Sequence, residues 1–170
     1  MQSKDFFSLG LQPVSNRFMI DSEARASAFE LAITWDQELG CPKLATPFPV
    51  SELQPIYPWI TCFEPEDTLD ELVEQLVNLP GISKDSVFFG YCFKDVTTLD
   101  RLKAKGFVNN RIVDPAADLG VSDPLANVET YQAHFNQITA NGISKNHGKC
   151  DVLIVRHVLE HAYDLEGFIA

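Results

Sequence analysis

An apolar stripe at helical spacing is the clearest pattern in the middle of the chain. It recurs at intervals of three and four residues and consists of Leu69, Leu72, Val73 and Leu76. This spacing predicts an amphipathic helix over residues 68–79, ended by Pro80-Gly81. Thr68 followed by Glu71 has the form of a capping box, so we expect Thr68 to be the N-cap. Six acidic residues and no basic one lie in 64–74, which indicates a solvated, negatively charged helix face.

Beyond this helix the pattern alternates between strands and helices. Short apolar, β-branched and aromatic runs predict strands at residues 87–93, 110–114 and 150–155. Helical spacing predicts short helices at residues 99–105, 128–138 and 158–170, whereas residues 116–127 have the composition of a loop. This order is typical of an α/β fold with about three parallel strands.

The N-terminal third has no comparable periodicity. Prolines stand at positions 13, 42, 47, 49, 55 and 58, so we expect irregular chain with turns and short strands. Residues 23–31 fit either a short helix or the approach to a strand. We therefore divide the chain into an irregular, proline-rich region at 1–63 and an α/β region at 64–170.

Composition narrows the class of protein. The chain has 170 residues, of which 45% are hydrophobic, enough for a substantial core. The net charge of −11 argues against nucleic acid or an anionic membrane as a partner, because both attract clustered lysine and arginine. The first ten residues lack the pattern of a signal peptide, and no apolar run is long enough for a membrane span, so we expect a cytoplasmic protein.

Candidate chemistry gathers where the predicted strands end. In an open parallel sheet, ligands bind outside the carboxyl ends of the strands. The three exits there contain Gly90, Tyr91, Lys94 and Asp95, then Asp114, then Arg156 and His157. Asp114 suits a hydrogen bond to ribose hydroxyls, or it starts a turn with Pro115. Neither a G-x-G-x-x-G motif nor a P-loop is present.

The segment "RHVLEH" at 156–161 contains H-x-x-E-H, the inverted zinc-peptidase motif. That reading needs both histidines on one face of a helix. Because the preceding run "CDVLIV" predicts a strand, His157 falls at a strand exit instead. The four cysteines contain no C-x-x-C pair, so we predict no metal site.

Four segments together resemble a known family. They are "SLGLQPVSNRF" (8–18), "YPWITCFEPEDTLDELVEQLVNLPGISKDS" (57–86), "FKDVTTLDRLKAKGF" (93–107) and "DVLIVRHVLEHAYDL" (151–165). The set is similar to class I S-adenosylmethionine-dependent methyltransferases of the sugar C-methyltransferase type. The resemblance implies a zinc-binding module followed by a Rossmann-like domain, with S-adenosylmethionine as cofactor. Here the C-x-x-C pairs of that module are missing, so we expect it to be degenerate and without zinc.

The resemblance also implies roles for the strand exits. Gly90, Tyr91, Lys94 and Asp95 would face the methionine part of the cofactor, Asp114 the ribose, and Arg156 with His157 the region of the methyl group. His157 is the candidate catalytic base, and the acceptor would be a small, sugar-like molecule.

Members of the family continue well beyond the segment that matches 151–165. We therefore expect a partial Rossmann-like sheet with an open edge, in an incomplete or inactive methyltransferase. Such an edge favours a homo-oligomer or a partner chain that completes the sheet. A non-catalytic interaction module that uses this edge is the alternative function.

Overall fold

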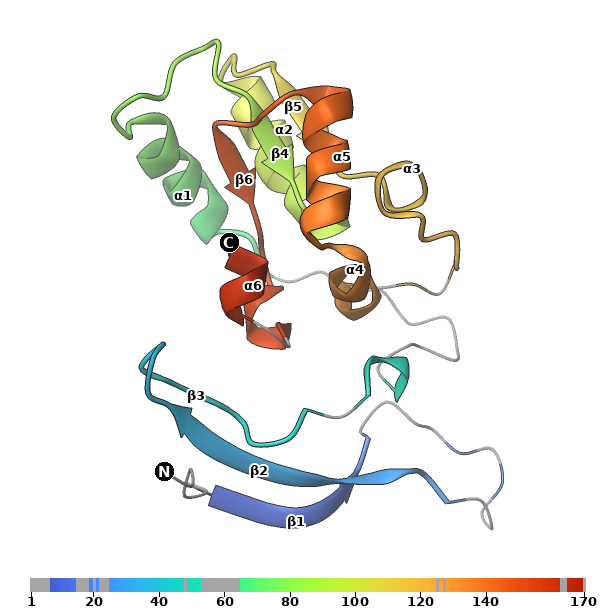
Figure 1. The fold of residues 1–170 in the computed structure, drawn as a ribbon. Helices are drawn as coiled ribbons and strands as arrows, with labels where there is room; N and C mark the ends of the chain where they lie inside the picture. The colour runs from blue at the N-terminus through green and yellow to red at the C-terminus, as the bar shows by residue number, and fades with distance from the viewer. Residues whose placement is uncertain are drawn as a thin grey trace. The chain divides into compact units, whose positions relative to one another are not determined.

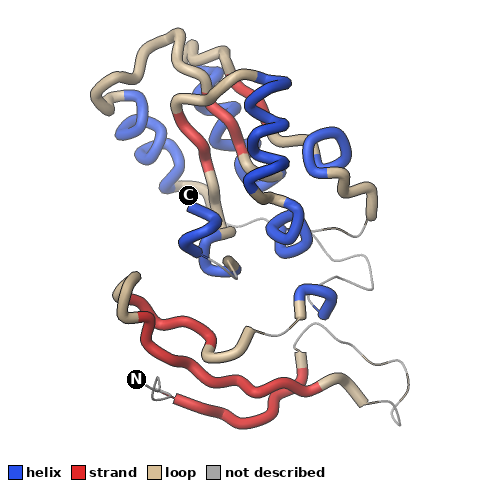
Figure 2. The backbone as a smooth tube through the Cα atoms, in the orientation of Figure 1, coloured by secondary structure: helices blue, strands red, loops and turns tan. Residues whose placement is uncertain are grey.

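In the computed structural model, the described residues are 7–14, 19, 21, 25–47, 49–52, 65–124, 126, 128–162 and 165–169. The chain divides into two compact units, Met1–Pro58 and Trp59–Ala170. Figure 1 gives the elements of each unit and Figure 2 distinguishes their helices and strands. The division falls five residues before the boundary expected from composition, in a stretch that lies outside the described residues.

The first unit contains a three-stranded antiparallel sheet, in the order β1 (Phe7–Pro13), β2 (Ala28–Asp36) and β3 (Cys41–Leu44). A short 3-10 helix, η1 (Val50–Glu52), follows. The turns and short strands expected in this proline-rich region are present in these segments; of the two alternatives for residues 23–31, the approach to a strand is the one that leads into β2. Pro13 and Pro42 lie in the two outer strands, where a missing N–H is tolerated.

A tight turn fixes the register between β2 and β3. Asp36 Oδ1 accepts the backbone N–H groups of Glu38 and Leu39 at 2.9 and 3.0 Å. Gly40 has a φ of 64°, a left-handed conformation that glycine adopts without steric cost. Asp36 Oδ2 lies 2.6 Å from Lys43 Nζ across the hairpin. Local side-chain contacts thus close the turn.

The second unit contains a three-stranded parallel sheet in the order β5-β4-β6. Its strands are β4 (Phe88–Gly90), β5 (Asn110–Ile112) and β6 (Val152–Ile154), each shorter than the apolar runs predict. The predicted parallel α/β arrangement of three strands is confirmed. β4 is the central strand, and all three of its residues are buried.

Helices cover both faces of this sheet (Figure 1). On one face, α1 (Thr68–Val77) and α2 (Val96–Ala104) pack through Val73, Leu99 and Leu102 against Phe88 and Ile154. The other face carries a larger cluster around Phe89, with members Tyr91, Val113, Leu119, Val121, Val128, Tyr131, Ile143 and Val158. The alternation of Phe88 and Phe89 between the two faces explains why the run is apolar without interruption.

The start of α1 differs from the prediction. Asp67 precedes the helix with φ −58° and ψ −29°, so the chain is already helical before Thr68 and no side chain caps it. The expected capping box of Thr68 and Glu71 is therefore wrong. Glu71 Oε1 instead accepts the side-chain amide of Gln75 at 3.1 Å, one turn further along the helix.

The remaining helices are more numerous than predicted. They are α3 (Pro115–Leu119), α4 (Val128–His134), α5 (Gln137–His147) and α6 (Leu165–Ile169), with 3-10 turns η2 (Phe93–Asp95) and η3 (Leu159–His161). The single helix predicted at 128–138 is wrong, because α4 ends at His134 and Asn136 caps a second helix, α5. Its Oδ1 accepts the N–H of Ile138 at 2.9 Å, while Thr139 Oγ1 accepts the N–H of Asn136.

Candidate functional site

The strand register brings three turns to one edge of the parallel sheet. Gly90 pairs with Ile112 on one side and with Ile154 on the other. Because the strands are parallel, the residues that follow these three positions leave the sheet at the same edge. The sequence predicted this gathering.

Asp95 joins the exits of β4 and β6. It is fully buried, and its Oδ2 accepts the N–H of Cys92 at 2.9 Å while its Oδ1 accepts the N–H of Arg156 at 3.0 Å. Burial raises the pKa of the Asp95 carboxyl, although these backbone donors act in the opposite direction. This side chain is a fixed internal acceptor that ties the two turns together.

Gly90 is required by close packing beneath the turn. A Cβ at this position would lie 2.9 Å from Asp95 Cβ and 3.1 Å from Leu99 Cδ1. The start of α2 therefore approaches β4 at a distance that only glycine permits. The packing of α2 explains this glycine, whatever binds outside the turn.

Tyr91 lies in the core and not on the surface of the edge. Only 1% of it is exposed, and its ring centroid is 5.1 Å from that of Phe135 and 5.5 Å from that of Phe168. Its hydroxyl is buried and has no hydrogen-bond partner among the described residues. Burial also raises the pKa of this phenol. The backbone of Tyr91 remains at the edge, but its side chain does not.

Arg156 braces the turn after β4. Its Nη1 donates to the carbonyl oxygen of Lys94 at 2.6 Å and to Thr97 Oγ1 at 3.2 Å, and it lies 3.5 Å from Glu66 Oε1. The side chain is 12% exposed. This guanidinium is therefore committed largely to contacts within the protein, and it holds the Lys94 backbone from the side of β6.

Glu66 is a member of this network that the sequence did not single out. Its Oε1 accepts the hydroxyl of Thr97 at 2.6 Å, and its Oε2 lies 3.2 Å from Arg101 Nη1. The hydrogen bond from Thr97, followed by that from Arg101, lowers the pKa of Glu66. The sequence did not indicate this role because Glu66 lies in an acidic run. Nothing in that run distinguishes a carboxylate that forms an ion pair from one that is solvated.

Asp114, at the exit of β5, has one engaged and one available carboxylate oxygen. Its Oδ1 caps α3 by accepting the N–H groups of Ala116 and Ala117 at 2.9 and 2.8 Å, with Pro115 as the first helical residue. Its Oδ2 accepts no hydrogen bond from the described residues, and the residue is exposed. Asp114 therefore starts the turn at α3, as one of the two alternatives predicted, and its Oδ2 is left to bind a ligand.

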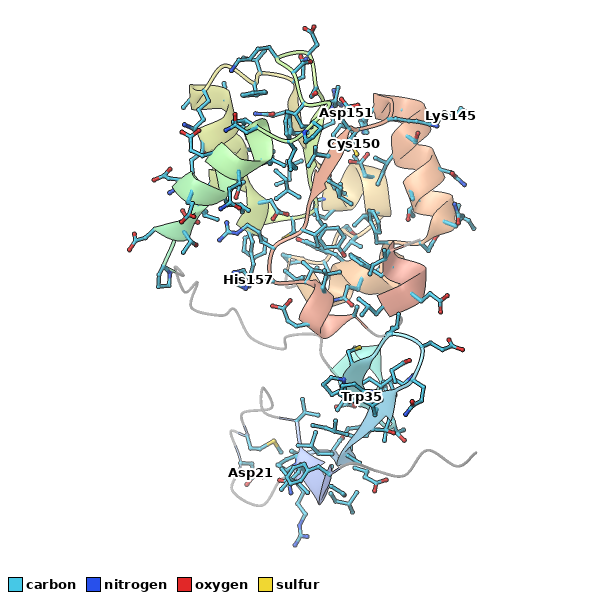
Figure 3. The ribbon with its side chains drawn as sticks, turned by 90° about the vertical axis from the view of Figure 1, so that its left-hand side faces the viewer. Asp21, Trp35, Lys145, Cys150, Asp151 and His157 are labelled. Carbon is cyan, nitrogen blue, oxygen red and sulfur yellow. The ribbon has the colours of Figure 1, made fainter. Side chains whose placement is uncertain are left out.

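His157, at the exit of β6, has a strained backbone. Its φ is 54°, unusual for a residue with a Cβ and often associated with functional sites. The side chain is 43% exposed, and its Nδ1 lies 3.6 Å from Glu160 Oε1. Figure 3 shows His157 at the surface, just past the end of β6. An exposed imidazole beside a carboxylate is a common arrangement for a group that accepts a proton in catalysis.

The geometry does not support a zinc-peptidase helix. His157 precedes the 3-10 turn Leu159–His161, so the two histidines of H-x-x-E-H do not share one α-helix. Among the side chains that the structure describes, no group of three or more histidine, cysteine or acidic residues could hold a metal ion.

No family model matches the chain, and no curated protein matches its sequence. None of the helices in the described segments is long and apolar enough to cross a membrane. The function therefore has to be argued from the residues at the sheet edge.

Proposed function

We propose that the second unit is a Rossmann-like, S-adenosylmethionine-binding domain that transfers a methyl group to a small, sugar-like acceptor. One observation carries the proposal. Asp114 and His157, both exposed, follow the two strands that flank the central β4, at the carboxyl edge of a parallel sheet, which is where this class of fold binds nucleotides. The resemblance of 57–86, 93–107 and 151–165 to sugar C-methyltransferases points in the same direction.

Asp114 would bind the ribose. Its capping oxygen fixes the carboxylate at the start of α3, and the other oxygen is left to accept a hydrogen bond from a ribose hydroxyl. An acidic residue at this strand end, about 20 residues after the first turn, performs that task in dinucleotide-binding folds.

The turn from Gly90 to Asp95 would support the methionine part of the ligand through its backbone. Asp95 and Arg156 hold this turn from within, so it does not need to be ordered when a ligand arrives. Lys94 contributes the carbonyl oxygen that Arg156 binds. These residues would therefore shape the site without direct side-chain contact to the ligand.

His157 would act as the base. When bound, S-adenosylmethionine supplies an electrophilic methyl group, and the acceptor must lose a proton as the new bond forms. The exposed imidazole at the exit of β6 is suited to take that proton, with Glu160 as the nearby carboxylate.

Calorimetric titration with S-adenosylhomocysteine tests the cofactor claim. We expect binding by the wild type and a loss of roughly tenfold or more in Asp114→Ser, because serine can still cap α3 but is too short to reach the ribose as well. Asn136→Ser is the matched control, a cap replacement at another helix. Absence of binding at about 1 mM ligand, or equal affinity of wild type and Asp114→Ser, would contradict the proposal.

A second candidate function follows from the open edge of β6. Among the described strands β6 pairs only with β4, and Leu153 on β6 is 42% exposed. We propose self-association of two copies through this edge as the alternative, non-catalytic role. Light scattering should then find a dimer that Leu153→Glu converts to a monomer. Leu72→Glu, on α1 with 43% exposure, is the control, and a monomeric wild type would exclude this role.

A further inference from the structure

A chain of hydrogen bonds that joins α5, α3 and β5 supports the backbone at the exit of β5. His147, the last residue of α5, places its Nε2 2.7 Å from Asp118 Oδ1 on α3. Asp118 Oδ2 in turn accepts the backbone N–H of Asp114 at 2.9 Å. On the other side of the imidazole, His147 Nδ1 contacts the guanidinium of Arg111 on β5. Figure 1 shows α3 and α5 beside each other, as this link requires.

The direction of the hydrogen bonds is determined by chemistry. A guanidinium can only donate, so His147 Nδ1 is the acceptor and Nε2 carries the proton that is donated to Asp118. Both oxygens of Asp118 are then used, one by His147 and one by the Asp114 backbone. These two donors account for the orientation of the Asp118 carboxylate.

Asp118 is well suited to a fixed, ionised role. Its side chain is only 4% exposed. Burial alone would raise the pKa of this carboxyl, but the hydrogen bonds from the Asp114 backbone and from His147 outweigh burial and lower it. The carboxylate is therefore charged at neutral pH and is a strong acceptor for the Asp114 N–H.

The consequence falls on Asp114. Its N–H is held by Asp118 and its Oδ1 by two backbone donors of α3, so both the backbone and the side-chain torsion are constrained. Its Oδ2 is then held in one direction before any ligand binds. Fixing a binding group in advance removes part of the entropy loss of association.

We propose that Asp118 and His147 are positioning residues that orient the available oxygen of Asp114 toward the ribose of the ligand. This inference rests on the proposed function, since it assigns a task to residues behind the proposed site. The two residues touch no ligand and act only through Asp114.

The test is a double-mutant cycle read by calorimetry with S-adenosylhomocysteine. We expect His147→Ala and Asp118→Ala each to weaken binding roughly fivefold in the wild-type background. In the Asp114→Ser background, His147→Ala should have no further effect, because the oxygen that it positions is gone. A merely structural role would weaken binding equally in both backgrounds.

Two further variants sharpen the result. His147→Gln keeps an N–H donor within reach of Asp118 and should restore most of the affinity that His147→Ala loses. Lys145→Ala changes an exposed residue of the same helix, labelled in Figure 3, and should bind like the wild type. In the unliganded protein, the Asp114 amide resonance should shift in Asp118→Ala but not in Lys145→Ala. If His147→Ala does not fold, Asp118→Ala takes its place in the double-mutant cycle, and its outcomes have the same meaning.

The possible failures are distinguishable. If wild type binds no S-adenosylhomocysteine, the proposed function falls and this inference falls with it. If wild type binds and Asp114→Ser does not, but His147→Ala and Asp118→Ala bind as wild type, only the positioning role is overturned. A loss in His147→Ala that persists in the Asp114→Ser background would have the same meaning.

Discussion

At the scale of single residues, Tyr91 combines a well-packed ring with an unsatisfied hydroxyl. The ring makes edge-to-face contacts with Phe135 and Phe168, which are favourable arrangements for aromatic pairs. The hydroxyl is buried without a partner among the described residues, which is unfavourable for folding. The two halves of one side chain therefore act in opposite directions on stability.

We expect Tyr91→Phe to stabilise the protein by about 1 kcal/mol, because it removes the unsatisfied hydroxyl and keeps the ring contacts. Chemical denaturation of the two proteins measures the difference. Tyr131→Phe is the control, since the hydroxyl of Tyr131 in the same cluster is not buried without a partner. A clear loss of stability in Tyr91→Phe would mean that its hydroxyl is hydrogen-bonded in solution.

The positions of the candidate site residues were predictable, but their orientations were not. Apolar runs that end in polar residues indicate where strands leave a sheet, and Asp114 and His157 are exposed at such exits. Tyr91 and Asp95 come from the same kind of turn and are buried. The orientation of Tyr91 depends on its packing against Phe135 and Phe168, and that of Asp95 on the close approach of α2 to Gly90. No local sequence pattern encodes either contact.

At the scale of elements, the helices of the second unit are stabilised at their ends and along their contacts. Asn136 and Thr139 exchange hydrogen bonds at the start of α5. Between α1 and α2, Arg101 Nε lies 2.9 Å from Asp70 Oδ1, and Lys105 pairs with Glu74. Such exposed ion pairs contribute little individually, so the cap is the stronger contribution.

We expect Asn136→Ala to lower the free energy of unfolding by about 1 kcal/mol, because two N–H groups of α5 lose their acceptor. Asn136→Ser should lose much less, since serine is also a good cap. Asn146→Ala, at an exposed position near the other end of α5, is the control for a change of asparagine within the helix. Equal stability of wild type and Asn136→Ala would show that water replaces the cap without loss.

At the scale of the whole molecule, the carboxylates connect stability to pH in both units. In the first unit, the hydrogen bond from Lys43, with that from the Leu39 backbone, lowers the pKa of Asp36 to about 2. The pKa values of Glu66 and Asp118 in the second unit are also lowered. The buried Asp95 has a raised pKa and acts in the opposite sense.

The sign of the effect follows from linkage. A carboxyl with a lowered pKa in the folded state stabilises the fold above its ordinary pKa of about 4, and this contribution is lost as the pH falls toward the folded value. Because the pKa of Asp95 is raised, its ionisation costs more free energy in the folded than in the unfolded state, so its contribution to stability declines as the pH rises. Three carboxyl groups with a lowered pKa act against one with a raised pKa. We therefore expect the melting temperature to fall by several degrees between pH 5 and pH 3.

Thermal unfolding followed by circular dichroism measures this dependence. Lys43→Met should remove the largest part of the contribution of Asp36, and NMR titration of the Asp36 carboxyl should then give a higher midpoint, still below the ordinary value because the Leu39 and Glu38 backbone donors remain. Lys145→Met removes an exposed charge without a described partner and is the control. A melting temperature that is constant or rises on acidification would contradict the prediction.

The sequence by itself determined the alternation of strands and helices in the second half, the parallel sheet, and the turns that follow its strands, but not the residues at which the strands end. These features follow from local periodicity and turn residues, which act over a few neighbouring positions. Only the tertiary structure decided that Arg156 braces Lys94, 62 residues away, that Asp95 joins two exits, and that His147 reaches Asp118. These contacts depend on the distances between packed elements, and packing is a property of the whole unit.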